Sequence, residues 1–480
     1  MKKCSLLLAI LMTLTLLAGC SDGKEASSGG AASSGGDTTS GGTETERVLY
    51  DDPEPVNMNG YEFVIGSPWL KNVATNSSTQ SEKLFHERKK QVEEAYNCKV
   101  KVISIYPDQN YLLKEIAAGN KMADVINMSL DMMIPAAALN QIRPLNEVEG
   151  IRLDDARWVE MYNTLGTIDG KTYGVNFTRP PEARACIYYN RDLLKNAGVT
   201  EDPQDLALAG EWTFDKFREM CIAATKDTNN DGVTDQYGLL PCNPDAAAFF
   251  FTTANNAPLV VKDASGKYVE NFNSQAFADA LNFYNDLVNT DKVVKIWEEH
   301  TAESTYNVDK FQDNLKFFTE GKAAFMTCDS WVGNQHLYKV SDQLNYGILP
   351  IPMGPNADRY YGFAKDGNLY AIPVTNNDLD KTVPIFNALA RPMEGYEGED
   401  WWLEDMQYEY FREGDTKSTQ LYETILDSSV LDIGTGIADM FAGINHVVRC
   451  SVLWRYETPN SYLNSSEGNY EIYIDAMFNR

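Results

Sequence analysis

The sequence predicts an α/β protein of two lobes, each built on a mainly parallel sheet flanked by helices. Segments typical of strands and helices alternate in the order β-α-β-α-β between residues 61 and 128, an order that indicates a parallel sheet. Further short strands are expected at 323–327, 346–350 and 370–373, between helical segments. The 480 residues also exceed what one small hydrophobic core can bury, which favours two lobes.

A short apolar segment precedes the folded part. Two lysines are followed by an apolar run at 6–17, which has the length of a secretory signal and is too short to span a bilayer. The run leads into LAGC at 17–20, which resembles a bacterial lipobox. The alternative is an ordinary signal peptide with an incidental cysteine at the cleavage site. We expect residues 1–19 to be a lipoprotein signal peptide and Cys20 to carry acyl chains such as palmitate.

Residues 20–47 are expected to be the lipidated cysteine and a disordered tether. They consist mainly of Gly, Ser, Thr and Ala, so they offer little apolar area to offset the entropy of ordering. This organisation predicts an extracytoplasmic domain that is lipid-anchored to the cell membrane of a bacterium. The net charge of −28 argues against a nucleic-acid partner.

The eight cysteines do not have the spacing of a disulfide scaffold or of a zinc site. Two belong to the N-terminal segments, and the other six are scattered through the chain. An extracytoplasmic location permits disulfide bonds, but the sequence does not select partners. Buried thiols are the simpler interpretation for most of these residues. The six are Cys98, Cys186, Cys221, Cys242, Cys328 and Cys450.

The elements of the first lobe follow one another closely. A strand at 61–66 precedes a helix at 78–96, in which apolar residues recur at helical spacing. A second strand at 99–105, a short helix at 111–118 and a third strand at 123–128 complete the alternation.

Ligands of parallel α/β sheets bind beyond the carboxyl ends of the strands. Residues 67–69 and 128–132 are therefore expected to form ligand-binding loops. Further along, helices are expected at 212–224, 274–288 and 309–318, and the tail from residue 395 is expected to be mainly helical.

Four motifs resemble those of the extracellular solute-binding proteins of ABC transporters, in the carbohydrate-binding group (family 1) that includes maltose-binding protein. Together, in this order, they cover about residues 61–392. The motifs are IAAG at 116–119 with ADVI at 123–126; GKTYGV at 170–175 with IYYNRDL at 187–193, continuing into WTFDKF at 212–217 and DTNNDGVTDQYG at 227–238; FTEGKAAFM at 318–326 with DSW at 329–331; and YGILPIP at 346–352 with AIP at 371–373.

The resemblance implies the two-lobe fold of periplasmic binding proteins, of type II, with hinge segments between the lobes. It places residues 48–183 and 351–393 in an N-terminal lobe, and residues 184–350 and 394–480 in a C-terminal lobe. It also implies the function: a monomer captures a carbohydrate between its lobes, and we expect this carbohydrate to be an oligosaccharide. The closed form then docks on the permease subunits of an ABC transporter and delivers the sugar for transport.

Sugar recognition needs aromatic faces for the C–H surfaces of the sugar and planar polar groups for its hydroxyls. Trp331 matches a position where the family places a sugar-stacking tryptophan, and Asp329 lies just before it. Asp131 matches a ligand-binding aspartate of the family. Trp69 follows the first strand. For each of these residues, a role in packing or in loop structure is the alternative.

Other candidates come from the lobe crossing and from later loops. Glu182 and Arg184 lie where the family often has a carboxylate that faces the cleft. Tyr361 belongs to a glycine-rich stretch before a strand, and Trp454 belongs to the tail. For each of these residues, a contact with the ligand and ordinary packing are the two alternative interpretations.

A loop with the spacing of calcium ligands lies at 227–238. Asp227, Asn229, Asp231 and Asp235 have the spacing of oxygen ligands around a glycine turn, but the bidentate Glu of an EF-hand is missing, because the twelfth position is Gly238. A structural Ca²⁺ is the one cofactor that the sequence suggests.

Enzyme function is not expected. The four histidines form no HExxH motif, and neither a GxSxG elbow nor a P-loop occurs. Adjacent acidic residues could serve a glycosidase, but they are more typical of a solvated surface. The alternatives that stay open are a surface lipoprotein of the same fold that binds a peptide or polyamine, and a glycan sensor without a transport role.

Overall fold

The computed structural model describes most of the chain after its N-terminal segments. The signal peptide, Cys20 and the tether lie outside the described residues, as do Trp69 and Arg184, so the predictions on them stay predictions. Among the helices that are described, none is both long enough and apolar enough to cross a membrane. The described residues are 50, 52–67, 80–105, 114–179, 181–183, 185–301, 310–364, 368–397, 401–466 and 468–479.

The first sheet forms from the predicted β-α-β alternation. Its strands lie in the order β13-β3-β1-β2, and β1 pairs in parallel with both β2 and β3. Strand β13 pairs antiparallel with β3. The strands are β1 (Tyr61–Ser67), β2 (Cys98–Ser104), β3 (Val125–Met128) and β13 (Leu369–Ala371).

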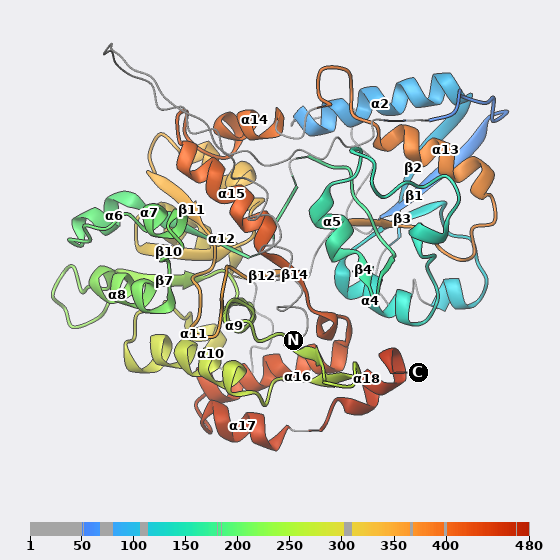
Figure 1. Cartoon of the computed structure of the whole chain (residues 1–480). Helices are drawn as coiled ribbons and strands as arrows, with labels where there is room; N and C mark the ends of the chain where they lie inside the picture. The colour runs from blue at the N-terminus through green and yellow to red at the C-terminus, as the bar shows by residue number, and fades with distance from the viewer. Residues whose placement is uncertain are drawn as a thin grey trace, which may run out of the picture. The chain divides into compact units, whose positions relative to one another are not determined.

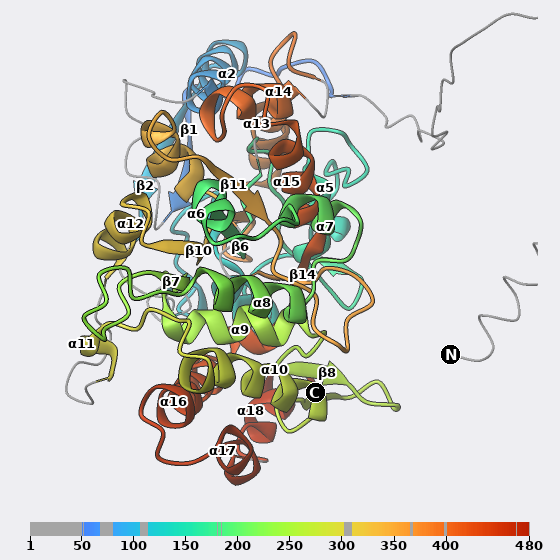
Figure 2. The same ribbon diagram turned by 90° about the vertical axis from the view of Figure 1, so that its left-hand side faces the viewer.

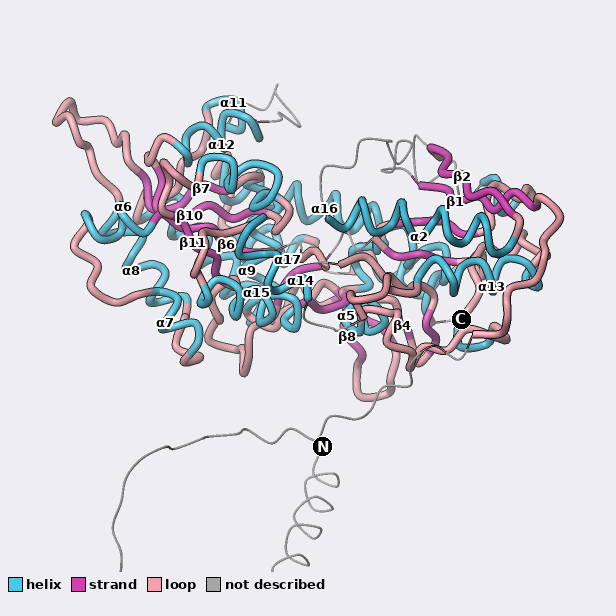
Figure 3. Tube along the Cα trace, turned by 90° about the horizontal axis from the view of Figure 1, so that it is seen from above, coloured by secondary structure: helices cyan, strands magenta, loops and turns pink. Residues whose placement is uncertain are grey.

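Helices α2 (Gln80–Tyr96) and α13 (Leu379–Ala390) cover this sheet. They contact each other and run side by side (Figure 3). Their buried residues, among them Val92 and Phe386, pack against Phe63 and Ile65 of β1 in one apolar cluster. The first lobe also holds α4 (Leu130–Ala138), α5 (Glu160–Leu165) and the hairpin of β4 (Thr167–Ile168) and β5 (Lys171–Thr172).

The strands of the second sheet lie in the order β11-β6-β10-β7, and Figure 1 labels β11, β10 and β7. The α/β class and the two-lobe fold are confirmed, but this sheet is mixed: β10 and β7 are parallel, whereas β6 is antiparallel to both β10 and β11. The reason is that β6 leads away from the lobe crossing, whereas β10 runs back toward it. The strands are β6 (Cys186–Asn190), β7 (Tyr237–Pro241), β10 (Ala323–Cys328) and β11 (Tyr346–Leu349).

Five helices of the second lobe begin at polar capping residues. The side chains of Asn190, Asp202, Thr213, Asn243 and Ser274 each accept a hydrogen bond from a backbone amide in the first turn, which satisfies donors that a helix leaves unpaired. The helices and the small hairpin of this lobe are α6 (Arg191–Asn196), α7 (Pro203–Leu208), α8 (Phe214–Ala224), α9 (Pro244–Ala254), α10 (Gln275–Asn285), α11 (Glu298–Thr301), α12 (Phe311–Thr319), β8 (Val260–Lys262) and β9 (Tyr268–Glu270).

Residues 350–356 follow β11 and are hydrogen-bonded to the second lobe. The Trp212 indole N–H donates to the Pro350 carbonyl at 3.1 Å, and the Asn356 amide donates to the Asn255 side chain at 3.0 Å. The chain then forms β12 (Gly362–Ala364) and reaches β13 of the first sheet. The lobe boundary expected near residue 351 thus falls in a segment that contacts the second lobe before it crosses.

The tail is mainly helical and contacts both lobes. Strand β14 pairs in parallel with β12, and the turn at Ile433–Gly436 packs against α4 of the first lobe. Helix α17 contacts α10, α18 contacts β9, and α16 contacts α9 (Figure 2). The tail elements are α14 (Trp401–Glu409), α15 (Thr416–Ser428), β14 (Ser429–Leu431), α16 (Ala438–Val448), α17 (Pro459–Ser465) and α18 (Glu471–Phe478).

A buried carboxylate joins this tail to the second lobe. Asp432 is 3% exposed and accepts hydrogen bonds from the amides of Leu259 at 2.6 Å and Gly434 at 2.9 Å. Burial raises the pKa of Asp432 to about 6, although its backbone hydrogen bonds act in the opposite direction.

The pKa of Asp432 predicts a pH dependence of stability. A carboxyl group whose pKa is raised by folding holds its proton more tightly in the folded state, so this stabilisation is present at low pH and is lost as the pH rises through about 6. We expect the free energy of unfolding of the wild type, relative to Asp432→Asn, to fall by up to about 3 kcal/mol between about pH 4 and pH 7. Urea unfolding of both proteins over this range measures the difference, and a difference that is independent of pH would contradict the prediction.

Candidate functional site

The crossing segment between the lobes is held from both sides. On the first-lobe side, the Tyr162 hydroxyl accepts a hydrogen bond from the Glu182 amide at 3.0 Å. On the other side, the Tyr422 hydroxyl of α15 donates to the Pro181 carbonyl at 2.7 Å. Both tyrosines are buried. The predicted site residue Glu182 therefore belongs to a segment whose backbone is fixed, and its side chain is half-buried.

Ser330 connects this crossing segment to the end of β10. Its hydroxyl accepts a hydrogen bond from the Ala183 amide at 2.9 Å, and its amide donates to the Ala183 carbonyl at 3.0 Å. The Tyr422 hydroxyl lies 3.1 Å from the Ser330 hydroxyl. The loop that carries Asp329 and Trp331 is thus positioned directly against the hinge.

Trp331 and Asp329 interact with each other at the carboxyl end of β10. The Trp331 indole N–H donates to the Asp329 carboxylate at 3.1 Å, and the ring is half-buried. The rings of Phe311 and His336 lie against it, with centroid distances of 5.4 and 5.7 Å. Packing on these rings holds the indole in place, and its remaining exposed part is available for a ligand.

Asp131 lies at the corresponding edge of the first sheet. It belongs to the first turn of α4, directly after β3, and accepts a hydrogen bond from the Ser129 hydroxyl. A carboxylate in the first turn is favoured by the helix dipole. This local role and a contact with a ligand are compatible, because the side chain is only half-buried.

The end of β7 contributes a buried ion pair that the sequence patterns did not predict. Asn243 caps α9, and Asp245 in its first turn pairs with Arg449 of the tail, with 2.7 Å between the carboxylate and Nε. Burial raises the pKa of Asp245, whereas Arg449 lowers it. Among the described residues, Oδ1 of Asp245 is buried without a hydrogen-bond partner.

A signal for the strand that precedes Asp245 was present in the sequence. The short apolar run at 237–241, bounded by a turn and a proline, forms β7, but it was not predicted as a strand. Since β7 is parallel to β10, Asp245 follows the same sheet edge as Asp329 and Trp331. Its partner Arg449 comes from the tail, for which no local pattern indicates such a contact.

Tyr361 and Trp454 make separate sets of contacts. The Tyr361 hydroxyl donates to Asp358 at 2.7 Å, and the Arg359 guanidinium lies 4.4 Å from the centre of its ring. Trp454 contacts the ring of His446 in the tail, with a centroid distance of 6.3 Å. Within the described residues, the buried indole N–H of Trp454 has no hydrogen-bond partner. These contacts join neither residue to Trp331, and the roles of both residues stay predictions.

The suggested calcium loop is closed by its own hydrogen bonds. The Asp227 carboxylate accepts from the amides of Asp231 at 3.2 Å and Gly232 at 2.7 Å, and Asp235 accepts from Thr228. Asp231 and Thr228 are exposed, and Asp227 and Asp235 are half-buried. In the part of the chain that the structure describes, no group of three or more His, Cys, Asp or Glu residues is arranged to hold a metal ion. Calcium binding at this loop stays a prediction.

Two cavities lie outside the loops that the sequence indicated. One of about 210 Å³ lies beside the crossing segment, between Trp158–Met161 of the first lobe and the tail helices α14 and α15. Trp402 and the acidic residues Glu160, Glu423 and Asp427 line it together with Arg179.

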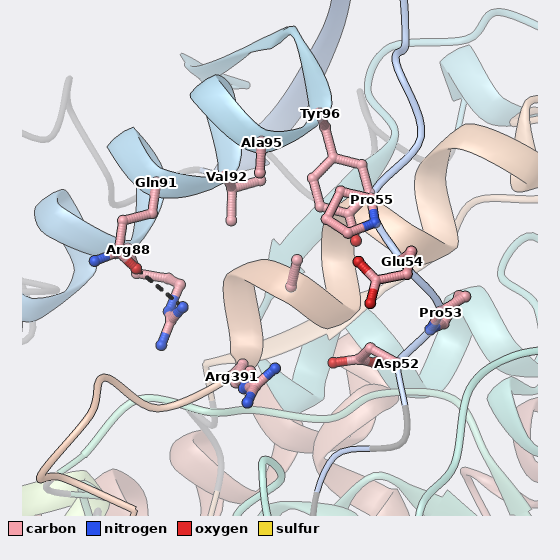
Figure 4. Close-up of a pocket in the computed structure, with 11 residues that line it drawn as sticks. Asp52, Pro53, Glu54, Pro55, Arg88, Gln91, Val92, Ala95, Tyr96 and Arg391 are labelled. Atoms are coloured by element: carbon pink, nitrogen blue, oxygen red, sulfur yellow. Dashed lines mark hydrogen bonds between the residues drawn. The ribbon is translucent and has the colours of Figure 1, made fainter.

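The other cavity, of about 310 Å³, is lined by α2, the end of α13 and the entering segment at 52–55 (Figure 4). Arg88 and Arg391 point into it from the two helices. Because it belongs to the helix layer of one lobe rather than to a strand end, we do not assign it to the solute site.

Comparisons with known proteins identify the family and the fold of this chain. Residues 87–392 match the model of a family described as bacterial extracellular solute-binding protein. No curated protein sequence matches the chain significantly.

Three solved structures share the fold. The sugar-binding protein MalE from Xanthomonas citri is 16% identical, with a TM-score of 0.62 over 86% of this chain and 97% of that chain. A cyclo/maltodextrin-binding protein complexed with maltotetraose is 14% identical, with a TM-score of 0.59 over 89% and 100%. The maltose/maltodextrin-binding domain MalE from Bdellovibrio bacteriovorus bound to maltotriose is 17% identical, with a TM-score of 0.58 over 86% and 99%. At these identities the likeness shows the fold.

The hinge contacts lead to a stability prediction. Tyr422→Phe removes the hydroxyl that donates to the Pro181 carbonyl, and a buried acceptor left unpaired costs about 1–3 kcal/mol. We expect urea unfolding to show a loss of this size. The matched control is Tyr408→Phe, since Tyr408 is 57% exposed, and we expect it to change stability by less than about 0.5 kcal/mol. Equal stabilities of the two variants would contradict the role of Tyr422.

Proposed function

Because this chain belongs to the bacterial extracellular solute-binding proteins, we propose that it captures a carbohydrate between its two lobes and delivers it to the permease subunits of an ABC importer. An oligosaccharide is the first expectation. The observation that carries the proposal is the pair of Trp331 and Asp329, which lies at the carboxyl end of β10 and directly against the hinge. An indole face with a neighbouring carboxylate suits a sugar ring and its hydroxyls.

The position of this pair also supports a role in closure. A ligand that contacts both lobes favours the closed state by its additional contacts. Asp131 offers a carboxylate at the edge of the first sheet, and Asp329 offers one at the edge of the second. A sugar with several hydroxyls can hydrogen-bond to both edges at once only in the closed state. It therefore binds the closed state more tightly than the open state, as closure requires.

The structural relatives add support for the substrate class. Two of them are bound to maltotriose and maltotetraose, and an ABC substrate-binding protein from Listeria monocytogenes is in complex with cycloalternan. We propose the same class for this chain, with capture and release rather than turnover. We also propose that Cys20 carries the lipid that holds the domain at the membrane, with residues 21–47 as the tether.

A thermal-shift panel tests the substrate class. A ligand present at 100 times its dissociation constant stabilises the folded state by about 2.7 kcal/mol, so we expect a rise of a few degrees with one family of oligosaccharides. Peptides and polyamines serve as comparators. A response to one of these and to no sugar would retain the fold and overturn the carbohydrate assignment.

The stacking role of Trp331 is tested by substitution. We expect Trp331→Ala to weaken binding of the oligosaccharide identified in the panel by at least about tenfold, since stacking contributes on the order of 1.4 kcal/mol or more. Trp331→Phe retains an aromatic face and should lose less. Titration calorimetry measures both, and Tyr473→Ala, at a residue that is 41% exposed, is the control. Unchanged affinity in a folded Trp331→Ala variant would place the ligand elsewhere.

A further inference from the structure

Three cysteines that are far apart in the sequence meet at one edge of the second sheet. Cys328 ends β10 and lies opposite Cys186 of β6 in the antiparallel ladder. On its other side, the parallel ladder between β10 and β7 runs to the pair Thr327 and Pro241. The next residues along the chain are Cys328, the last residue of β10, and Cys242, which directly follows β7. The Cys242 amide donates to the Thr327 carbonyl at 3.1 Å, so the strands are still paired at this point.

The geometry selects one of the two neighbours as the partner of Cys328. The Sγ atoms of Cys242 and Cys328 are 2.6 Å apart. The Cys186 thiol is instead directed at the backbone, where it donates to the Cys328 carbonyl at 3.2 Å. Paired strands lie about 4.7–4.9 Å apart, which falls within the Cα separation of about 4.4–6.8 Å that a disulfide needs.

We propose that Cys242 and Cys328 form a disulfide bond in the exported protein. In the structure, all six cysteines of the described residues are free thiols. Proteins of the extracellular family to which the chain belongs are exported to a compartment where disulfide bonds persist, so the close pair can be oxidised there. The partly exposed Cys242 thiolate attacks the disulfide of an extracytoplasmic thiol oxidoreductase, and that enzyme's second sulfur leaves as a thiolate. The Cys328 thiolate then displaces the oxidoreductase from the mixed disulfide. The two thiols thereby lose two protons and two electrons, and the oxidoreductase is reduced to its dithiol form.

The bond would join the two loops that follow β7 and β10. One loop carries Asn243 and Asp245, and the other carries Asp329 and Trp331. The cross-link joins residues that are 86 positions apart in the sequence, so it restricts the unfolded chain and fixes the spacing of the two loops before a ligand arrives. The disulfide itself does not depend on which solute the protein binds.

Differential alkylation tests the proposal on the full-length protein. The protein is isolated from the extracytoplasmic side of its host without reductant, and its thiols are blocked in denaturant with a first reagent. After reduction, a second reagent labels the cysteines that had been bonded, and peptide mass spectrometry locates both labels. We expect the second label on Cys242 and Cys328, and the first label on Cys98, Cys186, Cys221 and Cys450.

Variants make the pairing specific. We expect Cys186→Ser to leave the second label on Cys242 and Cys328, and we expect the same of the control Cys221→Ser, at a buried residue of α8. We expect Cys242→Ser to abolish the second label altogether. The proposal is overturned if Cys242 and Cys328 carry the first label in the wild type, or if the second label moves to Cys186.

Discussion

The arrangement of the two lobes depends on the way the chain crosses between them at residues 181–183. A crossing segment has no sheet to satisfy its backbone groups, and buried backbone groups need partners. In this protein the partners are side chains: Tyr162 from the first lobe, Ser330 from the end of β10 and Tyr422 from the tail. The hinge is therefore built by three distant parts of the chain, and these contacts hold the end of β10 against it.

The direction of the strands follows from this crossing. Because β6 begins at the crossing and β10 returns to it, the loop with Asp329 and Trp331 lies against the hinge, and β7, parallel to β10, directs its own loop to the same edge. The second lobe thus presents two polar loops side by side. Members of this family bind solutes, and in our proposal these two adjacent loops are the part of the second lobe that contacts the solute.

The tail completes the second lobe and connects it to the first. Its helix α15 supplies Tyr422 to the hinge, its strand β14 extends β12, and its Arg449 pairs with Asp245 at the start of α9. The turn at Ile433–Gly436 also packs against α4 of the first lobe. The tail therefore packs against both lobes.

The sequence by itself determined the α/β class, the parallel core of the first sheet and the place of Trp331 after a buried strand, because apolar periodicity and turn residues act over short distances. Neither β7 nor the pairs Asp245–Arg449 and Cys242–Cys328 were predicted from it. Only the tertiary structure decided these, since each joins residues that local patterns treat independently. The role of Tyr422 was also decided by the tertiary structure. In the sequence it is an ordinary apolar position of an amphipathic helix, and only the fold places its hydroxyl against the hinge.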